Sequence, residues 1–280
     1  YGVTPDRVVV TNGSDEVLSF AFMAYGDDGV AFPDITYGFY PVFANLNGVP
    51  YSEIPLNDDF TINVEDYIGV NKTIFIANPN APTGIALPLS DIERIVKSNP
   101  DNVVVIDEAY VDFGAESAVK LIEKYDNLLV TQTFSKSRSM AGGRLGFGIA
   151  SKELINDLNT VKYSTNPYNV NRMTMAAGVG ALEDTEYFEN NCKAIMENRE
   201  FTRQALEKLG FTVLPSRTNF VFAKTDKMDG GELYEQLKSK GILVRHFSNP
   251  KISQFNRITI GTREQMDVLL KENLQYAFPD

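Results

Sequence analysis

Short apolar runs that end in turn residues recur through the first half of the chain and predict β-strands. The runs at 73–79 and 102–108 are almost continuously apolar, a pattern typical of strands that are covered on both faces, as in a parallel sheet. The predicted strands lie at 7–13, 29–34, 73–79, 102–108, 127–135 and 146–151.

Helical patterns lie between these runs. Residues 14–25 begin with Ser14, a residue type that caps helices, and carry acidic residues in the first turn, where the helix dipole favours them. Residues 89–99 place apolar side chains at positions 92, 95 and 96, on one face of a helix. Because strands alternate with helices, we predict an α/β fold with a mainly parallel sheet flanked by helices.

The pattern changes after residue 184. Residues 185–210 predict one long helix that ends at Gly210, a residue suited to the position just after a helix. We therefore predict a large domain at 1–184 and a smaller C-terminal α+β domain at 185–280. Shorter elements follow the long helix: strands at 211–216, 219–224, 242–247 and 257–262, a helix near 231–241 and a last helix from Arg263.

Composition narrows the function. The chain carries 37 acidic and 26 basic residues, and its net charge of −11 argues against nucleic acid as a partner. One cysteine and one histidine exclude an intrachain disulfide and a His- or Cys-rich zinc site, and we assign no metal ligands. We find no apolar run long enough to span a bilayer and no signal peptide, so we expect no membrane partner and a cytoplasmic location.

Unusual residues follow four of the predicted strands: TNGSDE at 11–16, NPNAPTG at 78–84, IDEAY at 106–110 and TFSK at 133–136. In an open α/β sheet, ligands bind at the carboxyl ends of strands, so the fold would bring these motifs together. Singly, each has a simpler explanation, because NPNAPTG resembles a turn and NGSDE a capped helix start. IDEAY could belong to an ATPase, but the chain lacks the Gly-Lys pair of a phosphate-binding loop.

Taken as a set, the motifs NPNAPTG, DEAY, FSKSRSMAGGRLGF and RITIGTRE resemble the fold-type I pyridoxal-phosphate aminotransferases, and most closely the histidinol-phosphate aminotransferase family. The resemblance extends over the whole chain. It implies pyridoxal 5'-phosphate as cofactor, an amino donor and a 2-oxo acid as substrates, and a homodimer.

The resemblance also assigns roles around the cofactor. Lys136 is implied to bond covalently to the cofactor aldehyde and then to move a proton at the substrate, and its small neighbours leave it room to do so. Arg144 is implied to bind the cofactor phosphate, with help from hydroxyls and from backbone N–H groups at a helix start. The implied phosphate-binding residues are Ser14, Asp15, Thr133, Ser135 and Arg144.

Three further residues are matched to the cofactor ring. Asp107 is implied to keep the ring nitrogen protonated, which the ring needs in order to withdraw electrons. Tyr110 is implied to donate a hydrogen bond to the phenolic oxygen of the ring. Tyr37 matches the aromatic residue that stacks on the ring, although Tyr37 and Tyr40 could instead be core residues.

Two arginines are matched to the substrate. Arg257 matches the arginine that binds an anionic group throughout the family. Histidinol phosphate has no carboxylate, so its phosphate is expected at this arginine, with Arg245 as a second ligand. The implied reaction is transamination between histidinol phosphate and 2-oxoglutarate in histidine biosynthesis.

The chain departs from the family pattern in two places. Where the family has an asparagine that bonds the ring hydroxyl, this chain has Ala81; Asn78 or Asn80 could replace it, or Tyr110 could act alone, and Asn80 is our candidate. We also expect that the N-terminal arm of the family is missing. Three other readings remain open: a threonine-phosphate decarboxylase-like enzyme, an aromatic aminotransferase, and a catalytically silent fragment of the fold.

Overall fold

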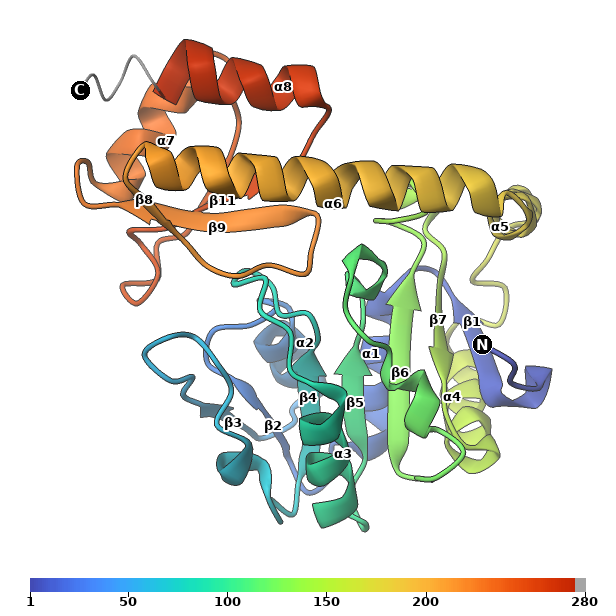
Figure 1. Cartoon of the computed structure of the whole chain (residues 1–280). Helices are drawn as coiled ribbons and strands as arrows, with labels where there is room; N and C mark the ends of the chain where they lie inside the picture. Colours follow the sequence, from blue (N-terminus) through green and yellow to red (C-terminus); the bar gives the residue numbers. More distant parts are fainter. Residues whose placement is uncertain (275–280) are drawn as a thin grey trace.

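The computed structural model describes residues 1–274, and its largest element is a seven-stranded sheet with the order β1-β7-β6-β5-β4-β2-β3. The strands run parallel except for β7, which is antiparallel to both of its neighbours. The predicted mainly parallel sheet is thus confirmed (Figure 1). The strands are Val8–Thr11 (β1), Val30–Pro33 (β2), Tyr51–Ile54 (β3), Thr73–Ala77 (β4), Val104–Asp107 (β5), Leu128–Thr133 (β6) and Gly146–Ile149 (β7).

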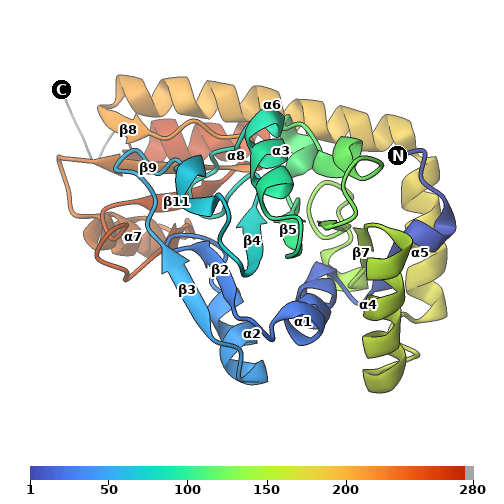
Figure 2. The same ribbon diagram turned by 90° about the horizontal axis from the view of Figure 1, so that it is seen from below.

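Helices cover both faces of this sheet, as Figure 2 shows. Phe75 and Val105 pack with α1, α2 and α4 on one face, whereas their neighbours Ile74 and Val104 pack with α3 on the other. Consecutive strand residues point to opposite faces, so a strand covered on both sides must be apolar throughout. The helices of this part are Ser14–Tyr25 (α1), Tyr40–Asn47 (α2), Leu89–Ser98 (α3), Lys152–Thr165 (α4) and Arg172–Glu183 (α5).

A second, antiparallel sheet has the strand order β10-β11-β9-β8. Its core includes Leu206 of α6, Leu233 and Leu237 of α7 and Met266 of α8. The carboxyl ends of β5 and β6 point towards this second sheet (Figure 1). The elements are Thr185–Lys208 (α6), Phe211–Val213 (β8), Phe220–Thr225 (β9), Gly230–Ser239 (α7), Arg245–His246 (β10), Asn256–Thr259 (β11) and Arg263–Asp267 (α8), which continues as a π-helix at Val268–Leu274.

Helix α6 lies across the top of both sheets and packs on β8 as well as on the short 3₁₀ helix Val111–Phe113 that follows β5 (Figure 1). Arg199 of α6 strengthens this junction, because its Nη1 donates to the carbonyl oxygen of Phe113 at 2.9 Å and to that of Thr218 at 2.6 Å. The predicted division into domains at 184/185 stays a prediction. None of the helices described within residues 1–274 is long and apolar enough to cross a membrane.

Most of the predicted elements are present, with shorter strands than the apolar runs suggested. Helix α1 begins at Ser14 and α8 at Arg263, as predicted. Gly210 follows α6 with a φ of +87°, a conformation that favours glycine. The sequence patterns did not predict α2, β3, α4 or α5.

Candidate active site

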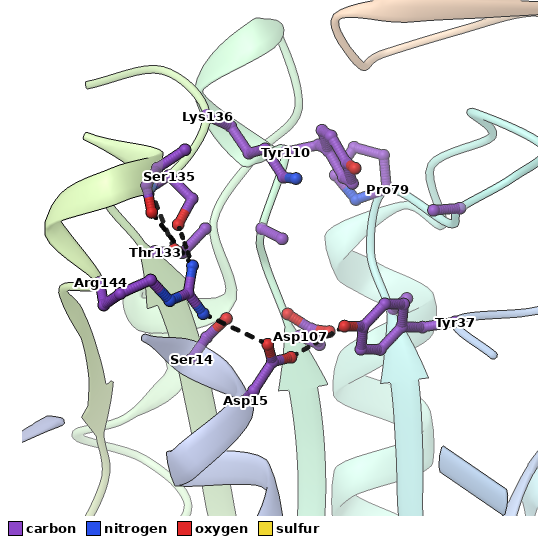
Figure 3. A pocket seen from close by; sticks show the side chains of 14 residues that line it. Ser14, Asp15, Tyr37, Pro79, Asp107, Tyr110, Thr133, Ser135, Lys136 and Arg144 are labelled. Atoms are coloured by element: carbon purple, nitrogen blue, oxygen red, sulfur yellow. Dashed lines mark hydrogen bonds and ion pairs between the residues drawn. The ribbon is translucent and has the colours of Figure 1, made fainter. Parts of the chain in front are cut away.

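A cavity of about 150 Å³ opens at the edge of the large sheet where β1, β4, β5 and β6 end and β7 begins (Figure 3). Its walls hold nine of the predicted site residues, although these are spread over more than a hundred positions of the sequence. The predicted residues in the walls are Ser14, Asp15, Tyr37, Asp107, Tyr110, Thr133, Ser135, Lys136 and Arg144. The remaining wall residues are small or apolar: Ala77, Pro79, Ala81, Ala109 and Ala141.

One end of the cavity is built for an anion. The guanidinium of Arg144 lies 3.4 Å from Ser135 Oγ and 3.5 Å from Asp15 Oδ2 (Figure 3). The guanidinium meets the N-terminus of α1. The N-cap residue of this helix is Gly13, which has no side chain to cap the first turn, so the N–H groups there can bind a ligand. A Cβ on Gly13 would lie 2.7 Å from Arg144 Nη2, and Gly13 has a φ of +81°. Glycine at this position therefore lets the arginine reach the helix start.

A buried carboxylate lies at the other end. Asp107 ends β5 and is only 5 % exposed. Tyr40 Oη donates to its Oδ2 at 3.2 Å, and Thr131 Oγ1 donates to its Oδ1 at 3.3 Å. Burial raises the pKa of Asp107 to about 6, in spite of these hydrogen bonds. No cation is bonded to Asp107 among residues 1–274, so the carboxylate is suited to a positively charged ligand atom.

The next residue, Glu108, points away from the cavity. Its carboxylate accepts hydrogen bonds from Ser117 Oγ, the backbone N–H of Ala118 and Gln132 Nε2. Burial raises the pKa of Glu108 to about 7. Because side chains alternate along a strand, only the first of the two adjacent acids faces the cavity. Glu108 is part of the supporting structure.

Lys136 reaches the cavity from the loop between β6 and β7. Its Nζ lies 5.4 Å from the centre of the Tyr110 ring. The following residue, Ser137, donates to Asp112 Oδ2 at 2.5 Å, which ties the lysine loop to the loop that carries Tyr110. The backbone around Lys136 is thus held in place, while its amine lies in the cavity beside the phenol of Tyr110 (Figure 3).

Tyr37 forms the wall opposite Arg144. Its hydroxyl donates to Asp15 Oδ1 at 2.9 Å, and its ring meets Tyr40 edge-on at 5.7 Å. Burial raises the pKa of the Tyr37 hydroxyl, and the charge of Asp15 adds to the shift. Since Tyr37 lines the cavity while Tyr40 is fully buried, only Tyr37 is available to a ligand ring.

The prediction that Asn80 binds the ligand is not supported by its position. Asn80 Nδ2 donates to the carbonyl oxygen of Ile35 and to Thr83 Oγ1, while Oδ1 accepts from Thr36 Oγ1. The alternative, Asn78, bonds the backbone of Leu87. The side-chain amides of Asn78 and Asn80 therefore stabilise the conformation of the loop after β4.

The cavity wall at this loop is instead made by its apolar residues. Pro79 and Ala81 face the cavity, and Asn80 does not. Of the candidates for a donor near the ligand ring, only Tyr110 lines the cavity.

Arg245 and Arg257 do not line this cavity. They face each other across β10 and β11 of the second sheet. The guanidinium of Arg257 lies 5.0 Å from the centre of the Phe220 ring, and Phe220 meets Tyr110 edge-on at 5.2 Å. Arg257 Nε is buried and has no hydrogen-bond partner in the described part of the chain, so it can accept an anionic ligand.

Two supporting residues were not identified from the sequence. Tyr40 and Thr131 bond Asp107, and neither belongs to a recognisable motif. Tyr40 occurs in a run of aromatic residues that looks like any core segment. The only available signal for Thr131 was its place on β6 opposite Asp107 in the sheet register.

Comparisons with known proteins point to a single family. The family model for aminotransferase class I and II matches residues 1–272. The chain is 48 % identical to the histidinol-phosphate aminotransferase of Brachyspira hyodysenteriae over 99 % of its own length and 78 % of the relative. It is 53 % identical to the histidinol-phosphate aminotransferase of Acinetobacter baumannii over 92 % of its length and 72 % of the relative.

Solved structures share the fold. The histidinol-phosphate aminotransferase of Sinorhizobium meliloti, solved in complex with pyridoxal-5'-phosphate, superposes with a TM-score of 0.89. The match covers 99 % of this chain and 79 % of that chain at 23 % identity. At this identity the likeness establishes the fold alone.

Proposed function

The chain belongs to the class I and II aminotransferases, and from this membership we propose that it transfers the amino group of histidinol phosphate to 2-oxoglutarate with pyridoxal phosphate bound in the cavity. It is a pyridoxal-phosphate-dependent aminotransferase by family. The observation that carries the proposal is the convergence of Lys136, Asp107 and Arg144 on one cavity. The names of the relatives at 48 % and 53 % identity support the substrate.

The cavity fits pyridoxal phosphate at three points. Arg144, Ser135 and the uncapped start of α1 match a phosphate group. Asp107, a buried carboxylate without a cation among residues 1–274, matches a protonated ring nitrogen. The amine of Lys136, exposed at its tip between these two ends, matches the aldehyde.

When bound, pyridoxal phosphate supplies an aldehyde that takes up amino groups and a ring that withdraws electrons. Asp107 holds the proton on the ring nitrogen, with Tyr40 fixing the orientation of the carboxylate. Lys136 Nζ would take a proton from the carbon of the donor that bears the amino group and, in the second half of the reaction, supply a proton to the former 2-oxo carbon of the acceptor.

The substrate's anionic end would bind at the second sheet. Histidinol phosphate carries a dianionic phosphate, which two guanidinium groups satisfy better than one. Arg245 and Arg257 stand opposite each other in register, and Arg257 has an unpaired buried Nε. 2-Oxoglutarate carries a carboxylate that can use the same Arg257. Both halves of the reaction would then share one anion site.

The test is a direct comparison of amine substrates. The protein is loaded with pyridoxal phosphate and assayed with 2-oxoglutarate and, separately, histidinol phosphate, phenylalanine and threonine phosphate. We expect the highest kcat/KM with histidinol phosphate. Faster transamination of phenylalanine, or release of carbon dioxide from threonine phosphate, would replace the substrate assignment. No turnover of any amine, in protein that has bound the cofactor, would favour a catalytically silent chain.

A further inference from the structure

A second cavity, of about 340 Å³, lies at the junction of the two sheets and shares no wall residue with the cavity of Lys136. Its size lies within the range of small-molecule sites. Three segments contribute to it: the loop after β4, helix α6 and the loop between β8 and β9. The charged residues in its walls are Arg199, Glu200, Arg203 and Arg217.

Arg203 and Glu200 form an ion pair with each other. Arg203 donates from Nε and Nη2 to the carboxylate of Glu200, at 2.9 Å and 2.6 Å, and from Nη1 to Glu207 at 2.6 Å. Glu200 is the only acidic side chain in the walls of this cavity as the structure describes it. Since it is engaged in a two-pronged ion pair with Arg203, its single charge cannot also balance both of the other arginines, although it acts on Arg199.

Arg199 is held in place by backbone carbonyls rather than by an ion pair. It is 9 % exposed, and its Nη1 donates to the two backbone carbonyls of Phe113 and Thr218. No acceptor for its Nη2 or Nε is found among residues 1–274. Burial lowers the pKa of Arg199, and the charge of Arg217 lowers it further. The donors that Arg199 does not use for these two carbonyls are available to an anion in the cavity.

Arg217 is equally unpaired. Its side chain forms no hydrogen bond or ion pair with any of the residues described. Its backbone N–H donates to the carbonyl oxygen of Gly84 at 2.8 Å, which holds the residue at the rim of the cavity. Gly84 ends the loop whose residues Pro79 and Ala81 line the active cavity.

The two unpaired guanidinium groups converge. A Cβ placed on Gly114 would lie 3.8 Å from Arg217 Nη1 and 3.9 Å from Arg199 Nη2. Gly114 has a φ of +107°, which disfavours other residues there, and Met196 Sδ lies 3.2 Å from the same Cβ position, so the two guanidinium groups come together beside the Met196 side chain. Two like charges so close together, in a protein of net charge −11, indicate a place for an anion.

We propose that this cavity binds a compact dianion, a phosphate monoester or a dicarboxylate, between Arg199 and Arg217. The ligand would join α6, the β8–β9 loop and the loop after β4, and so brace the second sheet against the wall of the active cavity. This site is separate from the Arg245–Arg257 pair and does not depend on the proposed reaction.

Isothermal titration calorimetry tests the site with two probes, inorganic phosphate and succinate, in chloride-free buffer. Wild type is compared with Arg217→Gln, an exposed position whose change leaves the fold intact. We expect wild type to bind one more equivalent of at least one probe than Arg217→Gln, or to bind it at least tenfold more tightly. Anion sites in the active cavity are the same in both proteins, so the difference reports only on the second cavity.

Two variants complete the test. The double variant Glu200→Gln with Arg203→Gln removes this ion pair as a unit, leaves no free acidic side chain in the cavity, and should keep the extra equivalent. Arg217→Lys keeps the charge and should retain part of the affinity. Binding of both probes that is equal in wild type and Arg217→Gln would overturn the proposal, as would equal losses in Arg217→Gln and the double variant. The probe with the larger difference identifies the ligand as phosphate or dicarboxylate.

Discussion

Lys136 Nζ lies 5.4 Å from the centre of the Tyr110 ring, which places the one amine of the active cavity against its one free phenol. Phe220 of the second sheet meets the same ring edge-on, and Arg257 lies over Phe220. A short series of direct contacts therefore connects the amine that we propose to react with the guanidinium that we propose to bind the substrate.

Lys136 should be indispensable. Lys136→Ala should lower kcat by at least roughly 10²–10⁴-fold, because no other amine lines the cavity that the structure describes. Borohydride reduction of the cofactor-loaded protein, followed by peptide mapping, should find the cofactor on Lys136. Lys152→Ala is the matched control, since Lys152 forms an exposed ion pair with Asp6. A reduced cofactor mapped to another lysine would sink the assignment.

Asp107 should control the electron-withdrawing power of the ring. Asp107→Asn keeps the shape but loses the charge, and we expect kcat to fall roughly 10²–10³-fold. Glu108→Gln, the buried neighbour that points away from the cavity, should lose far less. Steady-state kinetics of both variants decide the point, and equal losses would mean that the two acids act only through the fold.

The same carboxylate predicts a pH dependence of stability. The ordinary pKa of an aspartate is 3.8, and that of Asp107 is raised to about 6. Between these values the folded, cofactor-free protein holds more protons than the unfolded chain, so its free energy of unfolding falls as the pH rises from about 4 to 6. Across the whole window the raised pKa of Asp107 changes the free energy of unfolding by about 3 kcal/mol.

Denaturant unfolding of cofactor-free protein can isolate this contribution. Asp107→Asn should gain stability relative to wild type as the pH rises through the same window. Pyridoxal phosphate should reduce the difference, because a cation beside Asp107 favours the charged form. A stability difference between variant and wild type that is constant from pH 4 to 7 would contradict the buried carboxylate as its source.

The two arginines of the second sheet should differ in their effects. Arg257→Ala should raise KM steeply for histidinol phosphate and for 2-oxoglutarate, because we propose that both use it. Arg245→Ala should affect histidinol phosphate more than 2-oxoglutarate. The measurement is KM for each substrate at saturating partner. An effect of Arg245→Ala confined to 2-oxoglutarate would exclude the shared phosphate site.

The protein should be a dimer. Several large apolar side chains around α5 are exposed: Tyr168 by 92 %, Met173 by 83 % and Val179 by 55 %. An apolar surface of this kind favours association of two copies. Light scattering should give the mass of two chains, and Met173→Glu should shift the protein towards one. A monomer that binds a full equivalent of cofactor would contradict this expectation.

The sequence predicted the parts of the molecule whose residues have one dominant role. The central strands are buried on both faces and so are continuously apolar, and nine of the predicted site residues meet because strand ends meet at one edge. Helix α5 was missed because residues such as Met173 and Val179 are exposed, so no core-facing period marks it. The edge strand β3 was missed because it has no fully buried residue.

The site predictions are hardest to make from sequence where a side chain has two possible uses. Asn80 belongs to a motif associated with the cofactor, yet its amide is satisfied by Ile35, Thr36 and Thr83. Sequence alone cannot tell which way such an amide points. Tyr40 was the opposite case, since it looks like a core residue and also bonds Asp107.

Because β7 runs antiparallel to β6, these two strands and the loop between them form one hairpin. Thr133 and Gly146 are paired in the β6–β7 ladder, and Phe134 N–H donates to the carbonyl oxygen of Leu145 at 2.9 Å. Lys136 and Arg144 therefore belong to one closed hairpin loop. We propose that Lys136 binds the cofactor covalently and that Arg144 binds its phosphate, so the separation between these two anchors is set within that loop and does not depend on the position of the second sheet. Inserting or deleting a residue between these two anchors would be far more damaging than the same change in the β8–β9 loop.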